Sequence, residues 1–207
     1  MPNAKRLFTI GHSNQEWPAF VQVLKRLGIP LVVDVRSRPQ SSRHPQFSQP
    51  EFEATLREAE LKYHFLGEEL GGRPADAKAY RENGLVDYRA RRKSYGFQAG
   101  IERVQKELEK VSLVLMCAEE DPLTCHRFLM ICPELIASGI TPQHIRKGGV
   151  IETQMEAEDR LLEEVGFGDV MSSSLFAAGR GEALEQAYVR QAEKCAFRVD
   201  PALVEYW

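Results

Sequence analysis

A short apolar run at residues 31–35, L-V-V-D-V, limits the folds that are open to this chain of 207 residues. Such a run, with almost no polar alternation, is typical of a strand buried on both faces of a parallel sheet. Three further β-like runs are found at Leu7–Ile10, Lys62–Leu66 and Leu113–Cys117, and stretches with helical periodicity separate them. Strands that alternate with helices predict a doubly wound α/β fold.

The predicted architecture is Rossmann-like and three-layered: a mostly parallel sheet of about five strands with helices on both faces. We expect the fifth strand at Thr141–Ile145, within an α/β domain that spans residues 1–165. Residues 166–207 are expected to form a short C-terminal extension, in which a loose connection leads to a helix around Glu182–Cys195. Glycines and prolines after the third strand predict an extended loop with one short helix around Ala75–Glu82.

Helix boundaries are predicted from capping and breaking residues. Ser13 with Glu16 and Ser48 with Glu51 have the spacing of capping boxes, so each pair is expected to begin a helix. Further helices are expected at about Thr124–Ala137 and Thr153–Val165.

Composition excludes several classes of protein. Hydrophobic residues make up 43% of the chain and charged residues 28%, which is ordinary for a globular protein. No apolar run approaches the roughly 20 residues that span a bilayer, and the N-terminus does not have the pattern of a signal peptide. Four cysteines are too few for a disulfide scaffold. We therefore expect a cytoplasmic protein with no membrane partner; the oligomeric state is not predicted.

Polar side chains follow three of the predicted strands at the point where each strand ends. These clusters are Gly11-His12-Ser13, Asp34-Val35-Arg36 and Cys117-Ala118-Glu119. In an open parallel sheet, ligands bind in the crevice beyond the carboxyl ends of the strands. The three clusters are therefore expected to border one pocket.

The residue types in these clusters suit a phosphate-bearing ligand. Glu119 or Asp34 can accept hydrogen bonds from sugar hydroxyls or act as a general base. Arginines can hold phosphate through paired hydrogen bonds, and His12 and His126 are expected to titrate near neutrality. The candidate catalytic residues are Glu119, Asp34, Cys117, Cys125 and His126. The candidate ligand-binding residues are His12, Ser13, Arg36, Arg38 and Arg127, with Arg91, Arg92 and Tyr95 from a stretch that interleaves cations and aromatics.

The stretch Cys117–Arg127, C-A-E-E-D-P-L-T-C-H-R, leaves several kinds of chemistry open. Its cysteines are too far apart for the usual zinc spacing, and adjacent positions on the expected helix point about 100° apart, so no structural zinc is predicted. A catalytic metal held by Cys117, Cys125 or His126 with Glu119 is a less favoured alternative. A redox pair of Cys117 and Cys125 is an alternative, although three neighbouring acids oppose a thiolate. The spacing to Arg127 and the same acids exclude a cysteine-phosphatase loop.

Several motifs in order resemble the domain-of-unknown-function 488 family, over about residues 5–165. The motifs are Ile10–Ser13, Val33–Arg36 with Pro39, Leu70–Gly72, Cys117–Arg127 and His144-Ile145. The resemblance implies an α/β fold, and it implies no particular reaction.

The sequence therefore predicts a protein that binds, and in its enzymatic form processes, a nucleotide-like or nucleic-acid anion. The alternatives are a non-catalytic nucleotide sensor or nucleic-acid-binding module that uses the same crevice, and a thiol-redox protein. No cofactor is predicted in any of these cases.

Overall fold

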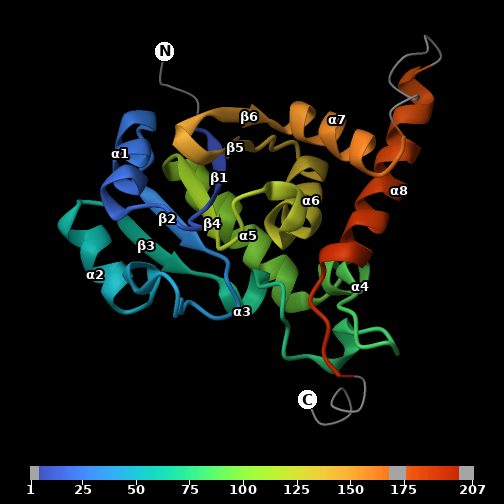
Figure 1. The fold of residues 1–207 in the computed structure, drawn as a ribbon, viewed down its shortest axis with the longest axis horizontal. Coiled ribbons are helices and arrows are strands. Elements are labelled where there is room, and N and C mark those ends of the chain that lie inside the picture. Colours follow the sequence, from blue (N-terminus) through green and yellow to red (C-terminus); the bar gives the residue numbers. More distant parts are fainter. Residues whose placement is uncertain (1–4, 168–175, 201–207) are drawn as a thin grey trace.

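Six strands form a single sheet in the computed structural model, which describes residues 5–167 and 176–200 (Figure 1). The strand order is β3-β2-β4-β1-β5-β6; all pairs are parallel except β5 with β6. The strands are β1 Leu7–Gly11, β2 Leu31–Asp34, β3 Lys62–Phe65, β4 Leu113–Cys117, β5 Gln143–Ile145 and β6 Ile151–Thr153. The predicted α/β class is confirmed, with one strand more than expected.

Helices cover both faces of the sheet (Figure 1). Side chains alternate along β2, so that Val32 packs with the helices of one face and Val33 with those of the other. One core includes residues of α1 and α2, and the second includes residues of α3, α5, α6, α7 and α8. The helices are α1 Trp17–Leu27, α2 Glu51–Glu58, α3 Gly67–Leu70, α4 Tyr88–Arg92, α5 Tyr95–Lys110, α6 Cys132–Ala137, α7 Gln154–Glu164 and α8 Phe176–Cys195.

Both predicted capping boxes are wrong. α1 begins at Trp17 without a side-chain cap, and Ser13 has a positive φ of 41° in the loop before it. The Ser48 hydroxyl accepts from the Ser41 amide instead of capping α2, whose N-cap residue is Pro50. A proline lies at the start of each helix, and its fixed φ favours helix initiation without a serine cap.

The predicted helix Thr124–Ala137 is divided into three parts. A 3₁₀ turn at Pro122–Thr124 is followed by Cys125 in an extended conformation, with φ −127° and ψ 138°. A π-helical turn, Arg127–Ile131, then leads into α6. Pro133 lies in the first turn of α6 and has no amide hydrogen, so a regular α-helical ladder cannot run through this position.

The C-terminal helix α8 packs against the domain. Ala183 and Ala187 are buried in the same core as α5, and the Val86 amide donates to the Phe197 carbonyl at 3.0 Å. The part of the expected connection at residues 168–175 lies outside the described residues. The helix expected around Ala75–Glu82 is only a 3₁₀ turn, Ala77–Ala79. No helix in the described ranges is both long and apolar enough to cross a membrane.

Candidate functional site

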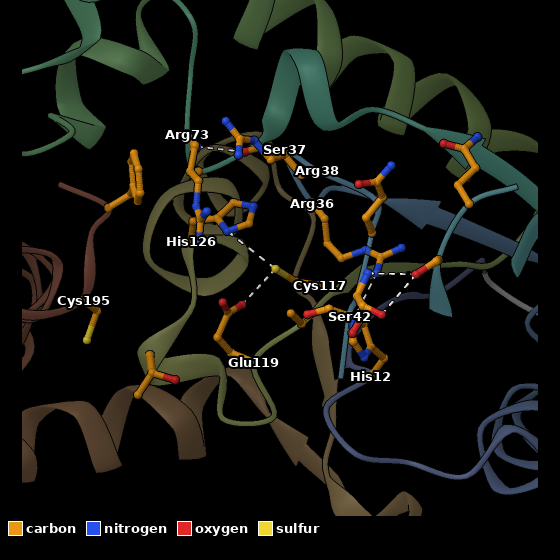
Figure 2. A pocket seen from close by; sticks show the side chains of 18 of the residues that line it. His12, Arg36, Ser37, Arg38, Ser42, Arg73, Cys117, Glu119, His126 and Cys195 are labelled. Carbon is orange, nitrogen blue, oxygen red and sulfur yellow. Dashed lines mark hydrogen bonds between the residues drawn. The ribbon is translucent and has the colours of Figure 1, made fainter. Parts of the chain in front are cut away.

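A pocket of about 810 Å³ lies at the carboxyl edge of the sheet (Figure 2). His12 follows β1, Arg36 follows β2, and Cys117 ends β4, so all three predicted strand-end clusters contribute to it. The remaining wall includes the loop after β2, the Gly72-Arg73 turn, and the end of α8 with the segment that follows it. The lining residues from these parts include Ser37, Arg38, Ser41, Ser42, Ser48, Arg73, Cys195 and Phe197.

The parallel register of β1 and β4 places the ends of these two strands side by side. Gly11 is paired with Cys117, and the His12 amide continues the ladder by donating to the Cys117 carbonyl at 2.9 Å. A Cβ atom on Gly11 would lie 1.7 Å from the Glu119 carbonyl oxygen. Only glycine therefore lets the loop after β4 fold across the end of β1.

Asp34 and Arg36 form a buried ion pair at the end of β2. Arg36 donates to Asp34 through Nη2 at 2.6 Å and Nε at 2.9 Å, and the Tyr63 hydroxyl donates to the same carboxylate at 2.9 Å. Asp34 is fully buried behind Arg36 and does not line the pocket. Its carboxylate is already satisfied by these donors.

His12 is held in a neutral form by two hydrogen bonds. Its Nδ1 donates to the Ser13 carbonyl at 3.0 Å, so Nε2 accepts from Arg36 Nη1 at 3.2 Å. Burial, and then the Arg36 charge, lower the pKa of His12 to about 4. The expectation that His12 titrates near neutrality is therefore wrong. Ser13 contributes this carbonyl and does not line the pocket.

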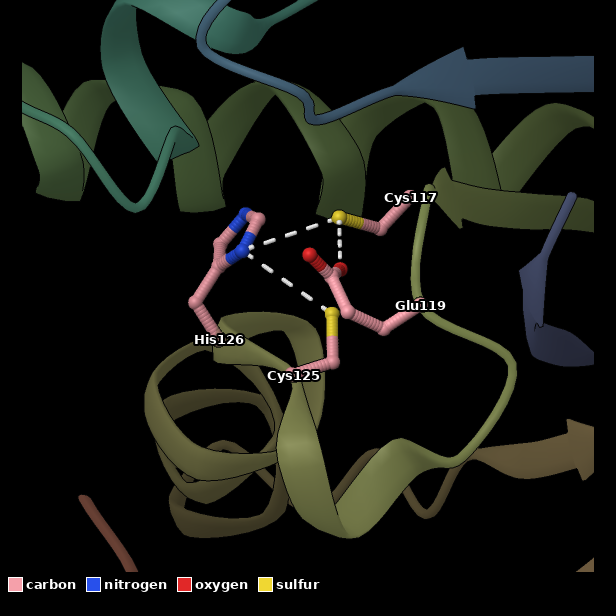
Figure 3. Close-up of side chains that lie close together, drawn as sticks. All are labelled: Cys117, Glu119, Cys125 and His126. Atoms are coloured by element: carbon pink, nitrogen blue, oxygen red, sulfur yellow. Dashed lines mark hydrogen bonds between the residues drawn. The ribbon is translucent and has the colours of Figure 1, made fainter. Parts of the chain in front are cut away.

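Four side chains converge beside the pocket: Cys117, Glu119, Cys125 and His126, which we call the thiol cluster (Figure 3). One donor atom from each lies within 4.8 Å of all the others. The Cys117 thiol donates to Glu119 Oε2 at 3.0 Å, and His126 Nδ1 lies 3.7 Å from the Cys117 sulfur and 3.9 Å from that of Cys125. The extended conformation of Cys125 turns its side chain to the same side as His126.

The surroundings of the two thiols shift their pKa values in opposite directions. Burial, followed by Cys125, raises the pKa of Cys117. Burial opposes ionisation of Cys125, but Cys117, Arg127 and His126 outweigh it and lower its pKa. Burial, and then Cys125, raise the pKa of Glu119. Both cysteines are almost inaccessible, with residue exposures of 3% and 1%, which does not suit an exposed redox sensor.

Arg127 is fully buried and does not line the pocket. Its guanidinium donates to the carbonyl oxygens of Glu119 and Glu120 at 2.6 and 2.8 Å, so it holds the loop that carries Glu119. Within the described residues, it has no carboxylate partner at ion-pair distance. It is placed to position this loop, whereas the sequence predicted that it contacts a ligand.

Comparison with known proteins assigns the chain to a family. A family model for "Domain of unknown function DUF488" matches residues 16–131. The chain belongs to the DUF488 family. The matched segment contains three of the motifs that carried the resemblance, whereas Ile10–Ser13 and His144-Ile145 lie outside it.

No curated protein matches this DUF488 chain. Two crystal structures of a protein from Shewanella putrefaciens CN-32, described as "Putative phosphatase (DUF442)", are similar to it. They are 10% and 13% identical in sequence, with TM-scores of 0.39 and 0.41, and each alignment covers 95% of this chain and 91% or 90% of the other. At these values the likeness carries no argument about function.

Three residues that were predicted to bind a ligand from the cation–aromatic stretch of this DUF488 protein lie away from the pocket. Arg91 is buried and donates to the carbonyl oxygens of Glu68 and Glu69, at 2.8 and 2.6 Å. Arg92 lies 3.6 Å from Glu134, and Tyr95 is 91% exposed. None of the three lines the pocket.

Other lining residues had not been singled out from the sequence. Arg73 lies with its guanidinium 4.5 Å from the Phe197 ring, and its amide donates to the Ser37 hydroxyl at 2.8 Å. The serines of the loop after β2 belong to a basic, serine-rich run that is visible in the sequence. No local sequence pattern identifies Arg73 or Phe197 as pocket residues, because they reach the pocket only through long-range packing.

Proposed function

We propose that the pocket binds a phosphate-bearing ligand of nucleotide size and that the protein acts on it at the rim formed by Cys117 and Glu119. The observation that carries this proposal is the lining of the pocket, which contains three arginines and, among the described residues, one carboxylate. Its volume of about 810 Å³ is within the usual range for small-molecule sites.

Arg38 and Arg73 are the cations available to a phosphate. Arg36 is neutralised by Asp34, whereas both other arginines are exposed and have no carboxylate partner among the described residues. Arginine suits phosphate because its planar fork donates two parallel hydrogen bonds. Serine hydroxyls beside Arg38 add neutral donors, and the Phe197 and Tyr88 rings offer an aromatic wall for a base.

The acids next to Glu119 are turned away from this ligand. Glu120 pairs with Arg146 at 3.0 Å, and Asp121 pairs with Arg160 at 2.8 Å. Glu119 is left as the carboxylate at the rim, where it suits the role of a general base. The four free cysteines fit a reducing compartment, and we propose a cytoplasmic location on that ground.

The test is an assay of wild type and Glu119→Gln with a panel of nucleotides, nucleosides and oligonucleotides. Binding is followed by calorimetry and products by mass spectrometry. An enzyme should lose turnover in Glu119→Gln while it keeps most of its ligand affinity, because the amide preserves shape and removes the base. Binding without product in both proteins would indicate a sensor, and a preference for oligonucleotides would indicate a nucleic-acid-binding module. If no member of the panel binds wild type, the proposal is wrong.

A further inference from the structure

The thiol cluster has the dimensions of a tetrahedral metal site. With zinc bonds of about 2.3 Å to sulfur and about 2.0–2.1 Å to nitrogen, neighbouring ligand atoms lie about 3.5–3.8 Å apart. The two sulfur-to-nitrogen distances at His126 are 3.7 and 3.9 Å, and all four donor atoms lie within 4.8 Å of one another. Two sulfurs, an imidazole and a carboxylate form a donor set that favours zinc.

His126 has its free lone pair directed at the two sulfurs. Its Nε2 lies 2.9 Å from the Val35 carbonyl oxygen, which can only accept a hydrogen bond. The proton of neutral His126 is therefore on Nε2, and Nδ1 is left as an electron-pair donor. Metal-binding histidines usually hold their second nitrogen in this way, by donation to a carbonyl or carboxylate. Gly72 packs against the ring, where an added Cβ would lie 2.8 Å from Cγ.

The buried charge of Arg127 supports the same conclusion. Among the described residues, this fully buried guanidinium contacts only carbonyl and hydroxyl oxygens and has no carboxylate at ion-pair distance, so its charge is poorly compensated. Two thiolates and one carboxylate carry three negative charges, and a divalent zinc ion would cancel two of them. The remaining negative charge would offset that of Arg127.

Cys125 and His126 were not expected to share one ion, because adjacent residues on a helix direct their side chains about 100° apart. The structure overturns this premise, because Cys125 is extended and precedes the helical segment. Consecutive residues across such a boundary can direct their side chains to one point.

We propose that Cys117, Cys125 and His126 bind a zinc ion and that Glu119 closes the fourth position from the pocket side. Cys125 lies behind the ion, whereas Cys117, Glu119 and His126 line the pocket. A ligand that enters the fourth position would displace Glu119, and the released carboxylate could then act as the general base; such an exchangeable position is typical of catalytic rather than structural zinc sites. This inference does not depend on which ligand occupies the pocket.

The test uses the full chain, purified under a reductant without chelators, with its metal content measured by mass spectrometry. We expect about one zinc per chain, consistent with a preformed site. Removal of the metal by a chelator and replacement with Co²⁺ should give thiolate-to-cobalt charge-transfer absorption and intense tetrahedral ligand-field bands. Wild-type protein that takes up neither zinc nor cobalt under reducing conditions would overturn the proposal, and this outcome does not depend on the folding of any variant.

Variants then locate the site. Cys117→Ser, Cys125→Ser and His126→Asn should each reduce bound zinc to background at equal total metal. Cys195→Ser is the matched control, because Cys195 also lines the pocket and lies outside the thiol cluster. It should keep the metal and the cobalt spectrum. Loss of metal in Cys195→Ser, or full retention in both Cys117→Ser and Cys125→Ser with circular dichroism like wild type, would assign the ion to other residues.

Discussion

The ion pair of Asp34 and Arg36 shows how a residue pair with functional appearance can be mainly structural. A carboxylate and an arginine at the end of a strand suggest a base and a phosphate ligand. In the structure they satisfy one another at 2.6 Å, and Asp34 is fully buried. Arg36 reaches the pocket only beside His12, whose pKa of about 4 keeps the imidazole neutral at pH 7.

Arg36→Gln should therefore destabilise the protein. The substitution leaves the Asp34 carboxylate buried with Tyr63 as its remaining side-chain donor, and breaking a buried pair costs about 3–5 kcal/mol. The measurement is the free energy of unfolding in urea. Arg57→Gln removes the same charge from a side chain that is 78% exposed, and it should change stability by less than about 0.5 kcal/mol. Equal stability of the two variants would show that the pair is unimportant.

Among the elements, one histidine of β5 links β1, its neighbour in the sheet, to the helix α7. His144 Nδ1 lies 2.8 Å from the Thr9 hydroxyl on β1, and Nε2 lies 3.0 Å from Gln154 Oε1 on α7. The sequence resemblance included this histidine without giving it a role. Thr9 also accepts from Arg127 at 3.4 Å, so the same chain of contacts reaches the loop that carries Glu119.

His144 predicts a loss of stability in acid. Burial, and then the Arg127 charge, lower its pKa from 6.5 to about 4 in the folded protein. The unfolded chain takes up this proton first as the pH falls. The contribution of neutral His144 to the free energy of unfolding is therefore fully present above pH 6.5. It decreases as the pH falls towards 4, by up to about 3 kcal/mol.

The measurement for His144 is the free energy of unfolding between pH 7.5 and about 4, for wild type and His144→Asn. His12 and the carboxylates titrate in both proteins, so the difference between the two curves isolates His144. Wild type should lose more stability than the variant across this window. Parallel curves would contradict the assigned role.

Strands and helices were predicted correctly where a local sequence pattern identifies them, and incorrectly where tertiary contacts determine the conformation. Continuous apolar runs such as Leu113–Cys117 identified the buried strands, because both faces of a parallel sheet are covered. β6 was missed because it is a three-residue edge strand whose last residue, Thr153, also caps α7. The extended conformation at Cys125 was missed because the surrounding sequence has helical periodicity.

At the scale of the whole molecule, the parallel sheet explains why a pocket could be expected before its shape was known. Parallel strands bring His12, Arg36 and Cys117 to one edge of the sheet, and this placement does not depend on the conformation of the loops. The part of the pocket wall formed by Phe197 could not be predicted, because this residue reaches the pocket from the segment after α8. The chain carries a net charge of −3, yet the described residues that line the pocket include more cations than acids.

Calorimetric titration of wild type, Arg38→Gln and Arg57→Gln with a nucleotide and its unphosphorylated nucleoside tests the central claim most directly. Wild type should bind the nucleotide more tightly than the nucleoside, and added salt should weaken nucleotide binding. Arg38→Gln should lose roughly 1.5–3 kcal/mol of nucleotide affinity, and the exposed Arg57→Gln control should match wild type. Equal affinity for nucleotide and nucleoside, or an equal effect of the two substitutions, would contradict a phosphate site in this pocket.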